Sequence, residues 1–166
     1  MVLGATGPVG HRVAQLLATA GAEVGLGSRS LERAEQLERE IAAHNPDARL
    51  TAHATGSADE LAAACEGVEL IVAAGAPGVE LLGAEARGQL AALRVAIDLN
   101  AVPPLGLGGV TVTDKGVDRS GTICYGAIGV GGTKMKVHKA AVQRLFESNG
   151  LVLETEAVFG IAEGLE

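Results

Sequence analysis

Short apolar runs alternate with longer amphipathic segments through residue 99. The apolar runs occupy residues 1–3, 24–27, 50–54, 68–73 and 94–99, and each has the length and composition typical of a β-strand. Between these runs, apolar residues recur at the period of a helix with one buried face. Strands that alternate with helices in this way predict a Rossmann-type, doubly wound α/β fold, with a mostly parallel sheet and helices on both faces.

Capping residues indicate where the helices begin and end. The first predicted helix stops at Gly21, and Ser30 is a typical N-cap for the second, which the segment 45–47 ends. Ser57 and Glu60 have the spacing of a capping box that opens a third helix. The residues of the second helix that are expected to face the sheet are Leu31, Ala34, Leu37 and Ile41.

Beyond residue 78 the sequence predicts one more helix before the last apolar run, and from Asn100 the pattern is less regular. A helix-compatible stretch runs to Ala92, and two further strands are predicted at residues 110–112 and 122–125. A long helix from about Thr133 to Ser148 and a short one from about Glu154 complete the chain. No repeat or linker divides the sequence, so residues 1–166 are predicted to form one domain.

Composition narrows the classes of partner. The formal net charge is -7, whereas a nucleic-acid-binding surface needs concentrated positive charge, so no nucleic-acid partner is expected. No apolar run approaches the roughly 18 residues of a membrane span, and residues 1–30 lack the charged segment and long apolar stretch typical of a signal peptide, so a cytoplasmic protein without a membrane partner is expected. Cys65 and Cys124 have no metal-ligand spacing and are expected to be reduced and buried, with no metal site.

A glycine pattern follows the first strand directly. Gly4, Gly7 and Gly10 lie between a strand and a helix, the context in which such a fingerprint indicates dinucleotide binding. Glycines let the backbone approach a pyrophosphate, and the helix N-terminus offers free N–H groups and a partial positive charge. Pro8 has no N–H, which leaves Val9 and Gly10 as the expected donors. The alternative is a glycine turn that serves only packing.

The tip of the second strand indicates which dinucleotide binds. An acidic residue there would hold the ribose hydroxyls of NAD, but this sequence has Ser28, Arg29 and Ser30. The Arg29 guanidinium can pair with a 2′-phosphate and stack on adenine, and Arg33 and the two serines are further donors. The sequence therefore predicts NADP in preference to NAD, against the alternative that Arg29 is a solvated charge where the helix begins.

Two further loops are expected at the same edge of the sheet, because Rossmann ligands lie beyond the carboxyl ends of the strands. The predicted cofactor contacts in these loops are Ala74, Gly75, Ala76 and Asn100. Asp98 is a candidate either to orient a ligand or to make local hydrogen bonds.

A second glycine-rich turn, at residues 126–132, is a less specific candidate to close over the cofactor or hold another anion. Lys134 and His138 follow it, but hydride transfer needs positioning more than a proton relay. No catalytic residue is therefore assigned.

Four segments together resemble the methylene-tetrahydromethanopterin dehydrogenases. They are residues 4–10, 101–109, 113–116 and 126–138, the last of which reads Gly-Ala-Ile-Gly-Val-Gly-Gly-Thr-Lys-Met-Lys-Val-His. Nearly the whole chain is similar to the NAD(P)-binding domain of that family. The resemblance implies reversible hydride transfer between a methylene pterin and NADP, with the pterin as a small-molecule substrate, and we also expect a homo-oligomer. The cofactor contacts that the resemblance implies are Gly4, Thr6, Gly7, Pro8, Val9 and Arg29.

One departure from that family leaves two hypotheses open. Its members carry a preceding domain, with the pterin expected in the cleft between the two domains, and only three residues precede Gly4 here. Because strands average about five or six residues, the chain is predicted to be a fragment that begins inside a central strand. It is either the cofactor half of a one-carbon dehydrogenase or a stand-alone NADP-binding module without catalysis.

Overall fold

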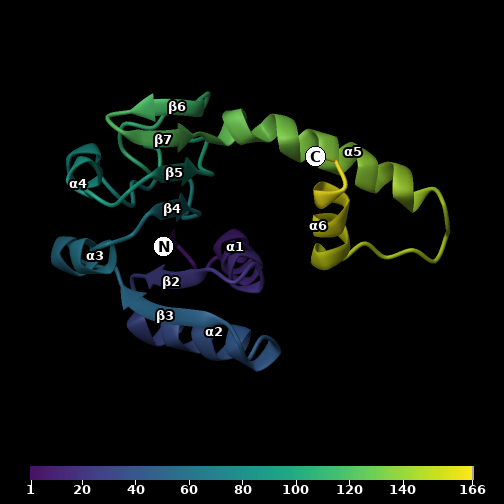
Figure 1. Ribbon diagram of the computed structural model, residues 1–166, viewed down its shortest axis with the longest axis horizontal. Helices are drawn as coiled ribbons and strands as arrows, with labels where there is room; N and C mark the ends of the chain where they lie inside the picture. The colour runs from purple at the N-terminus through teal and green to yellow at the C-terminus, as the bar shows by residue number, and fades with distance from the viewer. Residues whose placement is uncertain (166) are drawn as a thin grey trace.

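One sheet of seven strands forms the centre of the protein in a computed structural model that describes residues 1–165 (Figure 1). Its strands are β1 (Val2–Leu3), β2 (Glu23–Ser28), β3 (Arg49–Ala54), β4 (Leu70–Ala73), β5 (Val95–Asp98), β6 (Lys115–Arg119) and β7 (Thr122–Tyr125). Their spatial order is β3-β2-β1-β4-β5-β7-β6, and every neighbouring pair is parallel except β6 with β7. This is the doubly wound Rossmann order with an antiparallel edge strand, so the predicted fold class is confirmed.

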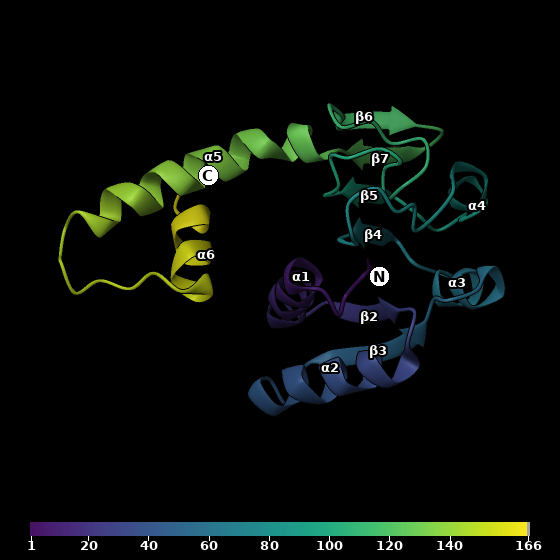
Figure 2. The same ribbon diagram turned by 180° about the vertical axis from the view of Figure 1, so that it is seen from behind.

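Helices pack on both faces of this sheet (Figures 1 and 2). The helices are α1 (Pro8–Thr19), α2 (Leu31–His44), α3 (Ala58–Ala64), α4 (Ala84–Gly88), α5 (Ala127–Leu145) and α6 (Thr155–Glu163). The predicted caps are confirmed, since Ser30 Oγ accepts a hydrogen bond from the N–H of Arg33, and Ser57 and Glu60 form a capping box. These caps satisfy N–H groups that a helix start leaves without partners.

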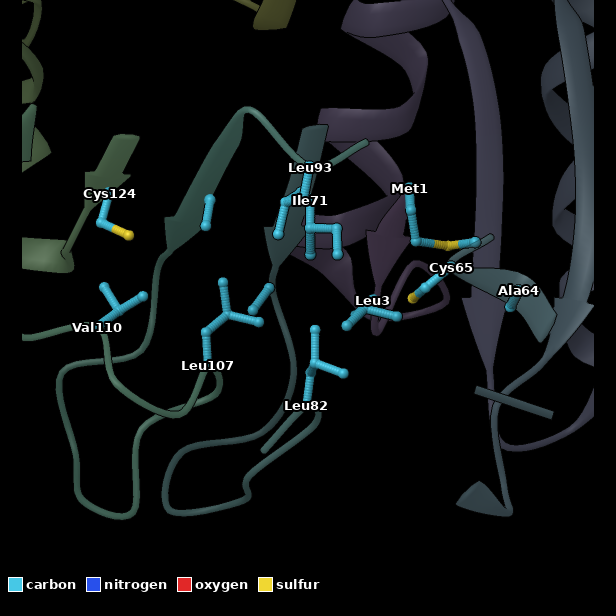
Figure 3. Packing of buried hydrophobic residues seen from close by; sticks show 12 residues of the cluster. Met1, Leu3, Ala64, Cys65, Ile71, Leu82, Leu93, Leu107, Val110 and Cys124 are labelled. Carbon is cyan, nitrogen blue, oxygen red and sulfur yellow. The ribbon is translucent and has the colours of Figure 1, made fainter. Parts of the chain in front are cut away.

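Two apolar layers hold the helices to the sheet. Val2 and Leu3 are fully buried and belong to different layers, because successive strand residues point to opposite faces. Val2 packs with residues of α1 and α2. Leu3 lies in the other layer with Ile71 and Leu107, under α3 and the loops that follow β4 and β5 (Figure 3). Both cysteines are buried and free, as predicted.

The segment predicted to be helical up to Ala92 is helical only in part, and the rest is irregular chain with turns. Only α4 is helical there, because the N–H groups of Leu81 and Leu82 both donate to the carbonyl oxygen of Gly106. This pairing buries Leu82 beside Leu107 in the core. Hydrogen bonding to a distant loop therefore takes the place of a local helix.

The strand predicted at residues 110–112 is wrong. Those residues lead into a turn that contains Asp114, and the strand at this edge is β6 instead, which is charged and largely exposed. Gly116, at a φ of +70°, accompanies a register shift in the pairing of β6 with β7. Edge strands commonly carry charges and bulges, which remove the apolar alternation by which a strand is identified in a sequence.

A buried carboxylate braces this edge of the sheet. Asp114 accepts two hydrogen bonds from the Arg119 guanidinium, both at 2.6 Å, and two from Thr111, through its N–H at 2.8 Å and its Oγ1 at 2.6 Å. The Arg119 guanidinium and the Thr111 donors hold the pKa of Asp114 well below its ordinary value. Bidentate charge-assisted pairs are strong, so Asp114 ties the turn to β6.

Replacing Asp114 with asparagine is expected to lower the free energy of unfolding by about 2–3 kcal/mol at pH 7, because an amide cannot accept both arginine donors. A carboxylate whose pKa falls on folding stabilises the fold above its unfolded pKa of about 3.9, and that contribution disappears as the pH falls toward the folded value. The difference between the two proteins should therefore narrow progressively below about pH 4. Urea unfolding at pH 7 and pH 3, with the exposed Asp47→Asn as control, measures this, and a gap that does not change with pH would contradict it.

Two helix predictions need correction. Leu31 remains 45% exposed because it lies in the first turn of α2, whereas Ala34, Leu37 and Ile41 face the sheet and are buried as predicted. The long helix α5 begins at Ala127, not near Thr133, so most of the second glycine-rich segment is helical.

The helices α5 and α6 form an arm, which we define as residues 127–165. α5 leaves the sheet after β7 and projects away from it, and α6 folds back beside α5 (Figures 1 and 2). Neither helix contains a buried residue. Among residues 1–165, no helix combines the length and the apolar character needed to cross a bilayer.

Candidate functional site

The glycine loop lies where the strand order of the sheet reverses. β1 pairs with β2 on one side and with β4 on the other, so the segments after β1 and β4 leave the sheet side by side. Gly4 has a φ of +75°, and its N–H and that of Ala5 both donate to the carbonyl oxygen of Gly27. A Cβ on Gly4 would lie 2.8 Å from the Cα of Gly75, so only glycine fits. Backbone thus packs on backbone at the crevice where Rossmann folds bind nucleotides.

The start of α1 carries backbone donors without partners. Gly7 is the N-cap, Pro8 has no N–H, and within residues 1–165 the N–H groups of Val9 and Gly10 make no hydrogen bond. A Cβ on Gly10 would overlap the carbonyl oxygen of Gly4, so the absence of a side chain brings the helix against the loop. Free N–H groups at the positive end of a helix suit a bound pyrophosphate. The arrangement fits the role predicted for residues 4–10.

Ser28 connects the glycine loop to the tip of β2. Its Oγ lies 3.5 Å from Oγ1 of Thr6 and accepts a hydrogen bond from the N–H of Ser30 at 3.3 Å. The side chain is only 7% exposed. Ser28 is therefore a brace between the predicted pyrophosphate loop at residues 4–10 and the predicted 2′-phosphate site at the tip of β2. The spacing of residues along the sequence did not reveal the contact between Thr6 and Ser28.

Arg29 and Arg33 are exposed at this tip. None of the three ion pairs within residues 1–165 includes either arginine. The backbone N–H of Arg33 donates a hydrogen bond to Ser30 Oγ in the helix cap, whereas its guanidinium takes no part in the cap. Two cations that no carboxylate neutralises, next to open backbone donors, make this part of the surface suited to an anion with several phosphate groups.

Glu60 is an acidic residue near the same tip. A Cβ on Gly56 would lie 3.4 Å from Glu60 Oε2 and 3.2 Å from the carbonyl oxygen of Arg29, so both border the same space. However, Glu60 Oε2 already accepts hydrogen bonds from the N–H groups of Gly56 and Ser57, each at 2.9 Å. Glu60 Oε2 is therefore engaged in the cap of α3.

The loops after β4 and β5 meet at the carboxyl edge of the sheet. The segment 74–76 is partly or fully exposed beside the glycine loop, as the prediction for Ala74, Gly75 and Ala76 requires. A Cβ on Gly78 would lie 3.7 Å from the carbonyl oxygen of Pro103, which shows how closely the two loops approach. Contact of these loops with a nicotinamide stays a prediction.

Asp98 and Asn100 both stabilise their own loop. Asp98 is fully buried, and its two carboxylate oxygens accept hydrogen bonds from the N–H groups of Asn100 and Leu107 at 2.9 and 2.8 Å. The Asn100 side chain accepts from Val102 N–H at 3.0 Å and donates to Pro104 O at 3.4 Å. The local role for Asp98 is thus the one that the geometry supports, and the predicted ligand contact of Asn100 remains a prediction.

The second glycine-rich segment does not offer an anion site of the kind seen at α1. The N–H groups of Ile128 and Gly129 both donate to the carbonyl oxygen of Val112, and that of Gly126 donates to Asp114 O. A Cβ on Gly126 or Gly129 would overlap the same turn, so these glycines serve packing. Sequence alone makes the two glycine runs look alike, and only the hydrogen-bond partners separate them.

One curated protein is similar to this chain in sequence. No protein-family model matches the chain. The bifunctional protein MdtA of Methylorubrum extorquens is 39% identical over 145 residues, which make up 86% of this chain and 49% of that protein. The chain therefore spans about half the length of the curated relative it matches.

A solved structure also shares the architecture. The crystal structure of a transhydrogenase from Sinorhizobium meliloti superimposes with a TM-score of 0.58 at 19% sequence identity, over 79% of this chain and 37% of that one. This likeness supports the Rossmann-type α/β fold that the strand order shows.

Proposed function

We propose that this chain is the NADP-binding domain of an oxidoreductase. The observation that carries the proposal is the combination, at one edge of the sheet, of the open N–H groups of Val9 and Gly10 with the unpaired Arg29 cation. The N–H groups suit the pyrophosphate, and Arg29 suits the 2′-phosphate that distinguishes NADP from NAD. The identity to MdtA and the likeness to a transhydrogenase support a nicotinamide dinucleotide as the class of ligand.

The substrate in this proposal is methylene-tetrahydromethanopterin or a related one-carbon pterin. Its support is the resemblance of the motifs at residues 101–109 and 126–138, together with the 39% identity to MdtA. Bound NADP would supply the hydride acceptor. The residues of this chain would bind and orient the cofactor, with the loops 74–78 and 100–104 bordering the reacting end. No side chain is assigned a proton-transfer role.

A stand-alone NADP-binding module without catalysis is the second candidate. The observation that favours it is the engagement of Asp98 and Asn100 in local hydrogen bonds, which leaves them braced within their own loop. The two candidates differ in one result. NADP-dependent oxidation of the methylene pterin by the chain together with the preceding domain of the family would establish the enzyme, whereas tight NADP binding without turnover in that combination would favour the module.

Calorimetric titration of the purified chain is expected to show NADP binding at least about tenfold more tightly than NAD, because a 2′-phosphate adds charge-assisted hydrogen bonds. Adenosine 2′,5′-bisphosphate and 5′-AMP test the same preference without the nicotinamide half. Equal affinities within each pair, or tighter binding of NAD, would contradict the assignment of NADP.

A further inference from the structure

Four exposed apolar side chains gather at one edge of the sheet. In residues 1–126, outside the arm, the large apolar residues that are 39% exposed or more are Val9, Leu31, Val79, Val102 and Val117. Val117 lies on the edge strand β6. The other four follow β1, β2, β4 and β5, at the carboxyl edge of these parallel strands. Exposed apolar side chains are normally scattered, so their concentration at the candidate site indicates a role there.

The strand order distributes these side chains along the site. β1 lies between β2 and β4, and β5 follows β4. Leu31 and Val9 belong to the parts of the edge already assigned to the 2′-phosphate end and the pyrophosphate loop. A dinucleotide whose pyrophosphate lies at this loop, with its 2′-phosphate near Arg29, has its other half beside β4 and β5. Val79 and Val102 follow those two strands, so they lie where the nicotinamide ring is expected.

Both valines are carried by loops that internal contacts hold in place. The N–H of Val102 donates to Asn100 Oδ1 at 3.0 Å. Val79 follows Gly78, whose φ is +73°, and a Cβ on Gly78 would lie 3.7 Å from the carbonyl oxygen of Pro103. The two loops thus meet one residue away from each valine. The valine side chains are nevertheless 44% and 51% exposed, so a fixed backbone presents them to whatever binds at this edge.

We propose that Val79 and Val102 pack against the nicotinamide ring of the bound dinucleotide, an inference that rests on the proposed function. We call these two residues the valine lip. The lip holds one face of the ring and excludes water from it, and it leaves the other face open to a substrate. Its two valines are positioning residues, and Asn100 supports the lip through its hydrogen bond to the backbone of Val102.

The small size of the valine lip favours a ring over a protein as its occupant. A stable protein–protein contact buries about 800 Å² on each partner, far more than two half-exposed valines provide. Phosphate and ribose groups gain nothing from aliphatic side chains, because they need hydrogen-bond partners when they leave water. The nicotinamide is the part of a dinucleotide that has flat apolar faces and lies on this side of the glycine loop.

The valine lip also distinguishes the two redox states of the ring. The nicotinamide of NADP⁺ carries a positive charge, and the hydride that it accepts makes it neutral in NADPH. Apolar surroundings disfavour a charge without a partner, so the lip favours NADPH. The carboxylate nearest along the chain is that of Glu80, whose Oε2 lies against Gly83 at the start of α4, 3.4 Å from where a Cβ would be. A carboxylate introduced into the lip itself would favour NADP⁺.

Isothermal titration calorimetry of the full chain with NADP⁺, NADPH and adenosine 2′,5′-bisphosphate tests this inference. Val102→Asp and Val79→Asp are each expected to weaken NADPH binding relative to NADP⁺ binding by about fivefold or more, because opposite charges about 4 Å apart attract by roughly that factor even in water. The bisphosphate keeps the adenine and the 2′-phosphate but has no nicotinamide, so its affinity should be unchanged.

Two further variants are matched controls. Val117→Asp places the same charge on the exposed valine of β6 and should leave all three affinities as they are in the wild-type chain. Val102→Ile keeps the lip apolar and should preserve the ratio of NADPH to NADP⁺ affinity. A folding defect would weaken all three ligands together, whereas the lip predicts a change in that ratio alone.

The possible failures are distinguishable. A ratio of NADPH to NADP⁺ affinity that is unchanged in both lip aspartate variants would overturn the valine lip and leave the proposed function standing. Equal losses for NADPH and the bisphosphate would also overturn the lip, because the effect would not come from the ring. A wild-type chain that binds none of the three ligands would overturn the proposed function and the lip together.

Discussion

Replacing Arg29 with alanine is expected to weaken NADP binding by about 10- to 100-fold while leaving NAD affinity within about threefold of its original value. Hydrogen bonds to a charged group contribute about 1.5–3 kcal/mol, and only NADP carries the 2′-phosphate that would receive them. Arg29 makes no ion pair within residues 1–165, so its removal breaks no internal contact that would disturb the fold. Isothermal titration calorimetry with both dinucleotides measures the two affinities.

Arg39→Ala is the matched control for this experiment. Arg39 is an exposed arginine of α2, the helix that begins two residues after Arg29, and it lies further along the chain from the tip of β2. Its removal subtracts the same charge from the protein, so it reveals any general electrostatic effect on an anionic ligand. Equal losses of NADP affinity in the two variants would mean that Arg29 has no specific role, and equal losses for NADP and NAD in Arg29→Ala would place the residue elsewhere on the cofactor.

Gly10→Ala is expected to lower the free energy of unfolding by about 2–4 kcal/mol and to abolish measurable dinucleotide binding. The new methyl group would overlap the carbonyl oxygen of Gly4, which is backbone and cannot rotate away. α1 would have to move outward from the glycine loop, and overpacking of this kind is costly. Urea unfolding followed by circular dichroism gives the stability, and titration under native conditions gives the affinity.

The control for this variant is Gly88→Ala in α4. A Cβ at Gly88 has no atom within 4 Å, so alanine should leave stability unchanged or raise it by up to about 1 kcal/mol. If Gly10→Ala behaved like Gly88→Ala, the close packing of α1 against the glycine loop would not be a determinant of the site.

Local signals predicted the half of the fold that contains the glycine loop. Ser30 and Ser57 cap their helices where the sequence indicates, because an N-cap needs only a side-chain oxygen a few residues from the N–H groups that it receives. The central strands are buried on both faces and therefore appear as continuous apolar runs.

The second half depends on contacts between distant residues. Leu82 is buried in the core because its backbone pairs with Gly106 and Gly108, which lie 24 and 26 residues later in the chain. The apolar periodicity of the segment around Leu82 does not indicate this pairing. The turn held by Asp114 and the charged strand β6 depend on an ion pair to Arg119, which is close in sequence but polar. Patterns of hydrophobicity do not register interactions of this kind.

The candidate site was also predicted only in part from the sequence. The glycines of residues 4–10 and the arginine at the strand tip were predicted from type and position, and the structure brings them to one edge of the sheet. The brace between Thr6 and Ser28 joins residues that lie 22 positions apart in sequence. It became visible only with the fold.

The contact of Gly4 with Gly75 has a consequence for how cofactor preference can change. Because main chain meets main chain there, this contact itself offers no side chain whose replacement would retune it. Under the proposed function, preference between NADP and NAD would be set by residues 28–33, where Ser30 caps α2 and Arg29 and Arg33 are exposed. Substitutions in that segment could exchange one dinucleotide for the other while the phosphate loop is inherited unchanged, so the two properties can evolve, or be engineered, independently.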